Sequence, residues 1–182
     1  MMMWSTERKE PAPYVVSVDM EIPLQNGMLA VVDDADAVLV ADYAWQAIKD
    51  HGVWYVRTRM LRKLAKRRIT IYMHHLILGK YPGAQVDHRD GDGLNNRRSN
   101  LRLATHSQNQ ANQLRLRPDN TTGFKGVIRC RNKWQAKIWN CGKVVHLGTF
   151  STAEQAAAAY DRKALELFGE FAATNAARMK VA

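Results

Sequence analysis

The chain has 182 residues, of which 46% are hydrophobic and 24% are charged, so it can bury a core and is not disordered throughout. Its net charge of +10 is spread unevenly. Residues 1–56 carry three Lys or Arg against nine Asp or Glu, whereas residues 57–117 carry fourteen against three and residues 118–182 carry ten against five. This basic excess indicates a polyanionic partner. The absence of a long apolar segment and of a signal-peptide pattern argues against membrane insertion and secretion.

The first part of the chain is predicted to contain a leader, a small mixed module and a basic connection. Residues 1–13 form the leader, and residues 14–68 form the mixed module. The expected elements are a strand over 29–32, a helix from Asp33-Asp34 through Leu39, and a hairpin over 45–59 whose turn is Asp50-His51-Gly52. The basic run over 62–68 is either a solvated turn or a phosphate contact.

Two further units follow, and together they predict an α+β fold. Residues 69–114 begin with an apolar run that ends at Gly79, a helix stop, and continue with a hairpin-like segment from Gln85. Thr105 caps a helix that runs through about Leu114, and residues 115–122 are a linker. The unit over 123–175 is expected to hold strands at 127–129, 134–139 and 143–150 and a helix capped by Ser151 or Thr152 that runs through Phe168 and ends at Gly169, with a tail over 176–182.

Four polar residues in the middle unit are candidates for metal binding and catalysis, namely Asp87, His88, Asn100 and Asn109. Asp87 and Asn109 offer oxygen ligands suited to a hard divalent metal, which favours Mg²⁺ or Mn²⁺. His88 is the side chain most able to take a proton from water near neutral pH. Because Asp87 and His88 are neighbours on one strand, they point to opposite faces, and Asn100 can bridge backbone groups in the loop that follows. This combination is what metal-assisted phosphodiester hydrolysis needs.

The same pattern resembles the HNH endonuclease family with its ββα-metal core. The match consists of the Asp-His pair, an Asn-Leu after it, and a helix Asn nine residues further on. The resemblance implies that Asp87 and Asn109 bind the metal, that His88 activates the attacking water, and that Asn100 orients it. Phage homing endonucleases of this family match further segments, namely Ile22-Pro23-Leu24, Val31-Val32-Asp33-Asp34, Tyr72-Met73-His74, Gly91 to Arg97, and Ser99 to Arg102. The chain departs from the pattern at His75, where Arg is expected, and at Asn95, which is often Asp.

Other polar residues near this site have two interpretations each. His74 either orients the site or packs under the hairpin, and His106 either faces the metal or lies on the solvent side. Arg97, Arg98 and Arg102 are surface charges or phosphate contacts, and beside a phosphodiester site we expect at least one of them to bind phosphate.

The last unit carries a second set of motifs. These are Gly126-Val127, Trp134 to Ile138, His146 to Phe150, Thr152 to Asp161, and Asn175. Over residues 123–171 they resemble the ethylene-responsive-factor (APETALA-type) DNA-binding domain. The resemblance implies a three-stranded antiparallel sheet laid in the major groove, with a helix packed behind it. Base specificity does not transfer, because Ile128, Trp139 and His146 replace residues that plant domains use.

Alternation along the strands predicts which residues face DNA. Ala136 and Ile138 face the helix with Val145 and Leu147, which places Gln135, Lys137, Trp139, Val144 and His146 on the opposite face. The residues expected to contact DNA are Lys125, Arg129, Arg131, Lys133, Gln135, Lys137, Trp139, Lys143 and His146. The alternative is an exposed sheet that is merely basic.

The sequence therefore predicts a metal-dependent HNH endonuclease of homing type. We expect it to act as a monomer on double-stranded DNA, to nick one strand, to need no small-molecule cofactor and no membrane, and to work in the cytoplasm of a phage-infected bacterium. One alternative is a sequence-specific DNA-binding regulator with a silent nuclease core. Another is a structural zinc protein that uses His74, His75, His88 and His106. Cys130 and Cys141 do not form a C-x-x-C pair and suit reduced thiols.

Overall fold

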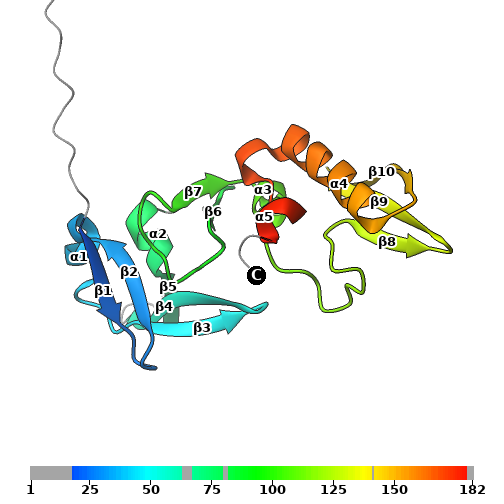
Figure 1. The fold of residues 1–182 in the computed structure, drawn as a ribbon. Coiled ribbons are helices and arrows are strands. Elements are labelled where there is room, and N and C mark those ends of the chain that lie inside the picture. Colours follow the sequence, from blue (N-terminus) through cyan, green and yellow to red (C-terminus); the bar gives the residue numbers. More distant parts are fainter. Residues whose placement is uncertain (1–17, 63–66, 80–81, 141, 180–182) are drawn as a thin grey trace, which may run out of the picture.

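The computed structural model describes residues 18–62, 67–79, 82–140 and 142–179. The predicted leader over 1–13, the middle of the basic connection and Cys141 lie outside the described residues. Small antiparallel sheets and short helices follow one another, which confirms the α+β prediction. Figure 1 shows the N-terminal strands at one end, a central part around β6, β7 and α3, and a C-terminal sheet with its long helix at the other end. None of the described helices has the length and apolar character needed to cross a membrane.

The N-terminal part consists of a two-stranded ribbon, a helix and a three-stranded sheet. Its elements are β1 (Asp19–Pro23), β2 (Leu29–Asp33), α1 (Asp34–Val40), β3 (Gln46–Asp50), β4 (Val53–Arg62) and β5 (Arg67–Tyr72). β1 pairs with β2, and β4 lies between β3 and β5. The predicted strand, helix and hairpin of this region are confirmed, whereas β1 was not predicted.

The apolar run over residues 69–78 splits into two elements. Its first part belongs to β5, which pairs with β4 from Arg57↔Tyr72 to Arg62↔Arg67, and helix α2 (Met73–Leu78) begins only afterwards. Ile69, Thr70 and Ile71 are β-branched and therefore suit a strand. The helix stop expected at Gly79 is confirmed, because Gly79 follows the last residue of α2 with φ of 89°.

A hairpin and a short helix form the centre of the molecule. β6 (Gln85–His88) pairs antiparallel with β7 (Leu101–Ala104), and α3 (His106–Ala111) follows. Thr105 caps α3 as predicted, because its hydroxyl accepts from Gln108 N–H at 3.2 Å while the Gln108 side chain accepts from Thr105 N–H at 2.9 Å. The helix ends three residues before the predicted Leu114, at the point where Asn112 turns its side chain toward β6.

One hydrophobic cluster joins the N-terminal part to this centre. Its buried members are Leu24, Ala30, Val32, Val40, Trp45, Ala47, Val56, Met73, Ile77 and Leu101. Gly93 contacts the N-terminal sheet closely, because a Cβ atom at this position would lie 2.1 Å from the carbonyl oxygen of Trp54. The boundary that the sequence suggested between residues 68 and 69 therefore runs through a shared core.

The C-terminal part is a three-stranded sheet covered by one long helix, as expected. In space the strands are ordered β10-β9-β8. Its elements are β8 (Val127–Cys130), β9 (Lys133–Asn140), β10 (Lys143–Phe150), α4 (Ala153–Phe168), the 3₁₀ helix η2 (Gly169–Phe171) and α5 (Asn175–Arg178). Thr152 caps α4, and Gly169 follows its last residue, both as predicted. η2 and α5 were not predicted.

Small residues let α4 lie close to the sheet. Ala156 and Ala157 are buried against Val127 and Ala136. Gly126 has φ of 73°, and a Cβ atom at this position would lie 2.0 Å from the Tyr160 ring, so only glycine fits. These positions explain why the motifs in this unit are so specific.

Asn175 and Lys125 hold the C-terminal part together and join it to the centre. The Asn175 side chain accepts from Lys125 N–H at 2.6 Å and donates to Asp161 at 3.0 Å. Lys125 Nζ in turn donates to the carbonyl oxygens of Ala111 at 2.7 Å and Gln113 at 2.9 Å. Burial lowers the pKa of Lys125 to about 8. Lys125 is thus a structural link rather than the DNA contact that the sequence predicted.

Candidate active site

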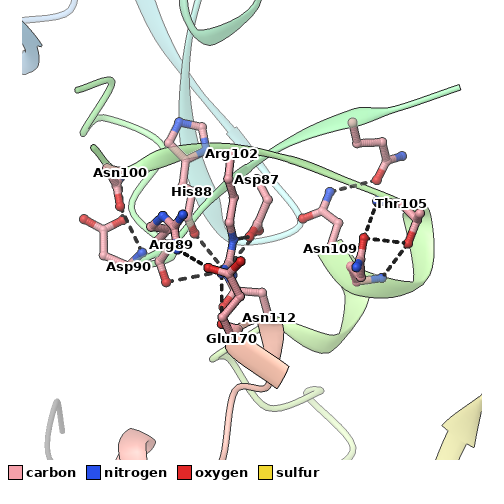
Figure 2. Close-up of polar contacts among 12 residues, drawn as sticks. Asp87, His88, Arg89, Asp90, Asn100, Arg102, Thr105, Asn109, Asn112 and Glu170 are labelled. Carbon is pink, nitrogen blue, oxygen red and sulfur yellow. Dashed lines mark hydrogen bonds and ion pairs between the residues drawn. The ribbon is translucent and has the colours of Figure 1, made fainter. Parts of the chain in front are cut away.

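Asp87 and His88 lie side by side at the end of β6, and both are buried (Figure 2). Asp87 is 4% exposed and His88 is 5% exposed. A strand whose opposite faces are both covered explains how two polar neighbours can be buried together. Burial of this kind is costly unless each group has a partner, so the partners define what the site can do.

Asp87 has a partner for each carboxylate oxygen. Arg102 Nε donates to Oδ2 at 2.7 Å across the β6–β7 pair, in which Asp87 is the register partner of Arg102. Asn112 Nδ2 donates to Oδ1 at 3.0 Å and to the carbonyl oxygen of His88 at 2.8 Å. The buried ion pair and the Asn112 bridge hold the carboxylate in one orientation.

The carboxamide beside Asp87 is that of Asn112, which follows α3 directly, and not that of Asn109, which the sequence predicted. Asn109 Nδ2 donates to Gln85 Oε1 at 2.8 Å, whereas Asn112, three residues later on the same side of the helix, contacts Asp87. Figure 2 shows Asn109 and Asn112 at different ends of this group of contacts. Sequence reasoning missed Asn112, although the spacing Asn109-x-x-Asn112 is visible in the sequence.

His88 is surrounded by rings and keeps a neutral imidazole. Its centroid lies 5.1 Å from that of His74 and 6.0 Å from that of Tyr55. Burial lowers the pKa of His88, and the Asn96 side chain and nearby carboxylates oppose this shift. Nε2 of His88 is buried without a hydrogen-bond partner among the described residues. A neutral histidine with an unused ring nitrogen is suited to accept a proton.

The structure separates the two interpretations of His74 and His106. His74 is 6% exposed between Tyr72, Tyr55 and His88, and burial lowers its pKa to about 2, so it packs under the hairpin. His106 is exposed and lies within hydrogen-bond distance of Gln85 and Gln110, which is the solvent-side interpretation. Among the residues that the structure describes, no three His, Cys, Asp or Glu side chains are arranged to hold a metal, which disfavours the zinc alternative.

Asn100 fixes the loop that follows β6. Its Oδ1 accepts from Asp90 N–H at 3.1 Å, and its Nδ2 donates to Asp90 Oδ1 at 2.9 Å and to the Asn95 carbonyl oxygen at 2.8 Å. Asn100 is only 8% exposed. The prediction that Asn100 bridges backbone groups is therefore confirmed.

The three arginines near the site, of which we expected at least one to bind phosphate, are engaged within the protein. Arg97 binds Asp19 of β1, with contacts of 2.6 and 2.5 Å. Arg98 binds the buried Asp36 of α1 at 2.8 and 2.7 Å. Arg102 is 7% exposed and bound to Asp87. The acidic N-terminal part thus acts as a scaffold that neutralises Arg97 and Arg98 and holds their loop.

The C-terminal sheet presents the face that alternation predicted. Lys137 pairs with His146 and Trp139 with Val144, so these side chains share one face, and Ala136 and Ile138 are buried on the other. Trp139 is 61% exposed. On the helix-facing side Leu147 packs as expected, whereas Val145 is 36% exposed, beside a register shift between His146 and Gly148.

Two predicted DNA contacts do not share this face. Arg129 alternates with Ile128 and lies beside its register partner Trp134, 5.9 Å from that ring, on the helix-facing side. Lys143, whose register partner is Asn140, lies at the open end of β10 on the same side. Successive side chains of a strand point to opposite faces, which explains why Arg129 and Lys143 lie on the side opposite to Lys137. Arg131 and Lys133 are exposed in and beside the turn that joins β8 to β9.

A cleft of about 850 Å³ runs between α3, the 115–122 connection and the sheet. Its lining includes four cationic side chains, namely Arg115, Arg117, Arg129 and Lys137, in addition to Lys125, whose ammonium group is bound to carbonyl oxygens. Trp139 and Ile128 of the exposed sheet face also border it. A cleft lined in this way suits a polyanion.

A hairpin followed by a helix, with a buried Asp-His pair and carboxamides around it, is the ββα arrangement expected of an HNH-type nuclease core. A family model described as HNH endonuclease matches residues 68–111. A protein of Acanthamoeba polyphaga mimivirus, described as an uncharacterized HNH endonuclease, is 40% identical over 154 residues, which cover 82% of this chain and 76% of that protein. The chain belongs to the HNH endonuclease family and is a nuclease.

Part of the chain is similar to segments of plant transcription factors. An APETALA2-like protein of Oryza sativa subsp. indica is 48% identical over 48 residues, which cover 25% of this chain but only 11% of that protein. An ethylene-responsive transcription factor of Arabidopsis thaliana is 39% identical over 107 residues, which cover 53% of this chain and 62% of that protein. These matches are partial, because the chain spans less than two thirds of either plant protein.

Proposed function

We propose that the chain is a metal-dependent endonuclease that nicks double-stranded DNA at the Asp87-His88 site. The observation that carries this proposal is the buried pair itself, a fixed carboxylate beside a neutral histidine whose Nε2 is unused. Hydrolysis of a phosphodiester needs a group that takes a proton from water, and His88 Nε2 supplies it. Asn100 keeps the β6 loop in place, and Tyr55 and His74 fix the ring from the other side.

The residues around Asp87 fit a hard divalent ion. The Asp87 carboxylate and the Asn112 carboxamide are in contact, and the Asn109 carboxamide lies on α3, bound to Gln85. These side chains offer oxygen ligands without thiolates, a donor set that favours Mg²⁺ or Mn²⁺. When bound, such an ion supplies stabilisation of the negative charge that develops on the phosphate and the leaving oxygen. Arg102 and Asn112 hold Asp87 ready in one orientation, and an ion would take over part of their role.

We infer that residues 123–175 act as an ethylene-responsive-factor-like domain that holds the DNA. The support is a three-stranded sheet backed by one helix, an exposed face with Gln135, Lys137, Trp139 and His146, and the partial matches to plant proteins. Arg131 and Lys133 lie at the turn and would contact phosphates. Arg115 and Arg117, which sequence reasoning did not select, border the same cleft and would extend this contact toward the nuclease core.

One active site per chain implies one cut strand per engagement. Asp87-His88 is the only Asp-His pair in the sequence that is followed by Asn100 and Asn109 at the spacing of the motif, so a monomer would nick, and a double-strand break would need a second copy or a second visit. The regulator alternative would require a silent site, and it is disfavoured because Asp87 and His88 are both present and buried together.

Supercoiled plasmid tests this proposal. The wild-type protein with Mg²⁺ or Mn²⁺ should convert the plasmid to open circles, and EDTA should prevent the conversion. Linear product at the earliest time points would replace nicking by double-strand cleavage. If the protein binds the plasmids but leaves all of them uncut, including plasmids from libraries of candidate sites, the regulator alternative would be favoured.

A further inference from the structure

Glu170 reaches from the C-terminal part to the candidate active site (Figure 2). It lies in η2, directly after α4. Its carboxylate is bound by Arg89, and the same Oε2 accepts from Arg102 Nη1 at 3.2 Å. The Glu170 carbonyl oxygen accepts from Arg102 Nη1 at 2.9 Å, and Phe171 stacks under that guanidinium, 3.7 Å from Cζ to the ring centroid. The C-terminal part thus touches the residues that surround Asp87.

The two arginines that bind Glu170 differ in how firmly they are held. Arg102 is buried, and its second partner is the buried Asp87. The Arg89 side chain is 45% exposed and that of Glu170 is 60% exposed. An ion pair that is open to water is weak and exchanges readily, whereas a buried pair does not. The hydrogen bond from Arg89 is the main cause of the lowered pKa of Glu170, so the group is a carboxylate at neutral pH.

Arg89 lies directly beside the candidate active site. It follows His88 directly, and its backbone N–H donates to the Asn100 carbonyl oxygen at 2.9 Å, so its position is fixed by the same loop as the site. A guanidinium binds carboxylates and phosphates through the same N–H geometry. Among the described residues, Glu170 is the only side-chain partner of this guanidinium. The guanidinium that Glu170 occupies is therefore of a kind that also suits a phosphate.

Resting on the proposed nuclease function, we propose that Arg89 binds a DNA phosphate beside the scissile bond and that Glu170 occupies this position until DNA displaces it. Arg89 then acts as a substrate-binding residue. Glu170 acts as an internal competitor that reduces the affinity of the free enzyme for any polyanion. Contact with DNA transfers Arg89 from the carboxylate to the phosphate and leaves Glu170 with Arg102 as its remaining arginine partner.

The two parts of the molecule stay docked when the Glu170 carboxylate is neutralised. Ala173 N–H donates to the Ala111 carbonyl oxygen at 3.1 Å, and Lys125 Nζ binds carbonyl oxygens at the end of α3. The Arg178 guanidinium binds the Leu114 carbonyl oxygen. Replacing Glu170 by Gln therefore removes the competitor without removing the interface.

A binding cycle tests this competition. Affinity for a labelled DNA duplex is measured in EDTA for the wild type, Glu170→Gln, Arg89→Gln and the double variant. Glu170→Gln should bind about two- to fivefold more tightly, Arg89→Gln more weakly, and Glu170→Gln should have no effect in the Arg89→Gln background. Glu166→Gln is the matched control, because it removes a carboxylate that is paired with Lys163 on α4, away from Arg89.

Two results would overturn the proposal. Equal tightening by Glu170→Gln with and without Arg89, or by Glu166→Gln, would mean that only overall charge matters. Weaker binding by Glu170→Gln would make Glu170 a brace for Arg102 rather than a competitor. A wild-type protein that binds no duplex would instead contradict the nuclease proposal itself, which distinguishes that failure from the other two.

Discussion

Replacing Arg102 by Met should destabilise the nuclease core strongly. Asp87 and Arg102 are 4% and 7% exposed, and Arg102 donates to Asp87 Oδ2 at 2.7 Å, so the substitution leaves a buried carboxylate with Asn112 as its remaining side-chain donor. Removing one partner of a buried pair costs about 3–5 kcal/mol in free energy of unfolding. Methionine preserves most of the side-chain volume against Phe171, so the loss of stability measures the removal of the Arg102 charge rather than a loss of packing.

A double-mutant cycle isolates this interaction. Asp87→Asn together with Arg102→Met removes both charges and should recover about 2–3 kcal/mol of the loss. Urea unfolding followed by circular dichroism in EDTA measures each free energy. Arg97→Met is the control, because the side chains of Arg97 and Asp19 are 30% and 48% exposed and their pair should contribute less than about 1 kcal/mol. An Arg102→Met protein within about 1 kcal/mol of the wild type, or a double variant no more stable than the single one, would refute the reasoning.

Three further predictions concern other parts of the molecule. Burial lowers the pKa of His74 from its ordinary value of 6.5 to about 2 in the folded protein, so below pH 6.5 the unfolded chain binds a proton at His74 that the folded chain does not. The free energy of unfolding should therefore fall by about 1.4 kcal/mol for each pH unit below 6.5. The urea midpoint of His74→Gln should depend less on pH between about 6.5 and 4.5 than that of the wild type, and parallel curves for the two proteins would contradict burial of a neutral ring. Gly126→Ala should cost about 2 kcal/mol more than Gly142→Ala in thermal or urea unfolding, because both glycines have positive φ but only the first Cβ would meet the Tyr160 ring; equal losses would refute that packing. Lys137→Ala should reduce the slope of log affinity against log salt by about 0.9, whereas Lys163→Ala on α4 should leave it unchanged, and the reverse result would remove the exposed sheet face from the interface.

The sequence predicted the elements whose signals are local. Turn glycines, the Thr105 and Thr152 caps and strict alternation in β9 were sufficient for α3, α4 and the C-terminal sheet. The apolar run over 69–78 was ambiguous, because such a run suits a strand or a buried helix equally, and pairing with β4 decided its first half. Such tertiary pairing leaves no local mark in the sequence.

The site was predicted in part for the same reason. The Asp87-His88 pair and Asn100 were recognisable from spacing, whereas the choice between Asn109 and Asn112 depends on how α3 lies across β6. The binding of Arg97, Arg98 and Arg102 to carboxylates within the protein was not predicted, because a basic residue beside a nuclease motif is readily interpreted as a phosphate contact. Asp19 and Asp36, the partners of Arg97 and Arg98, lie 78 and 62 residues away in the chain. Arg102 binds Glu170, 68 residues away, in addition to its register partner Asp87.

Single-turnover cleavage of a duplex is the most direct test that DNA is hydrolysed at the Asp87-His88 site. The wild type, His88→Ala and His106→Ala are compared with saturating Mg²⁺ or Mn²⁺, and duplex affinity is measured for each in EDTA. His88→Ala should lose at least about 100-fold in rate with unchanged affinity, while His106→Ala, which removes an exposed histidine of the same unit, should cleave like the wild type. A His88→Ala protein that cuts at the wild-type rate would contradict the assignment and move the active site elsewhere in the chain.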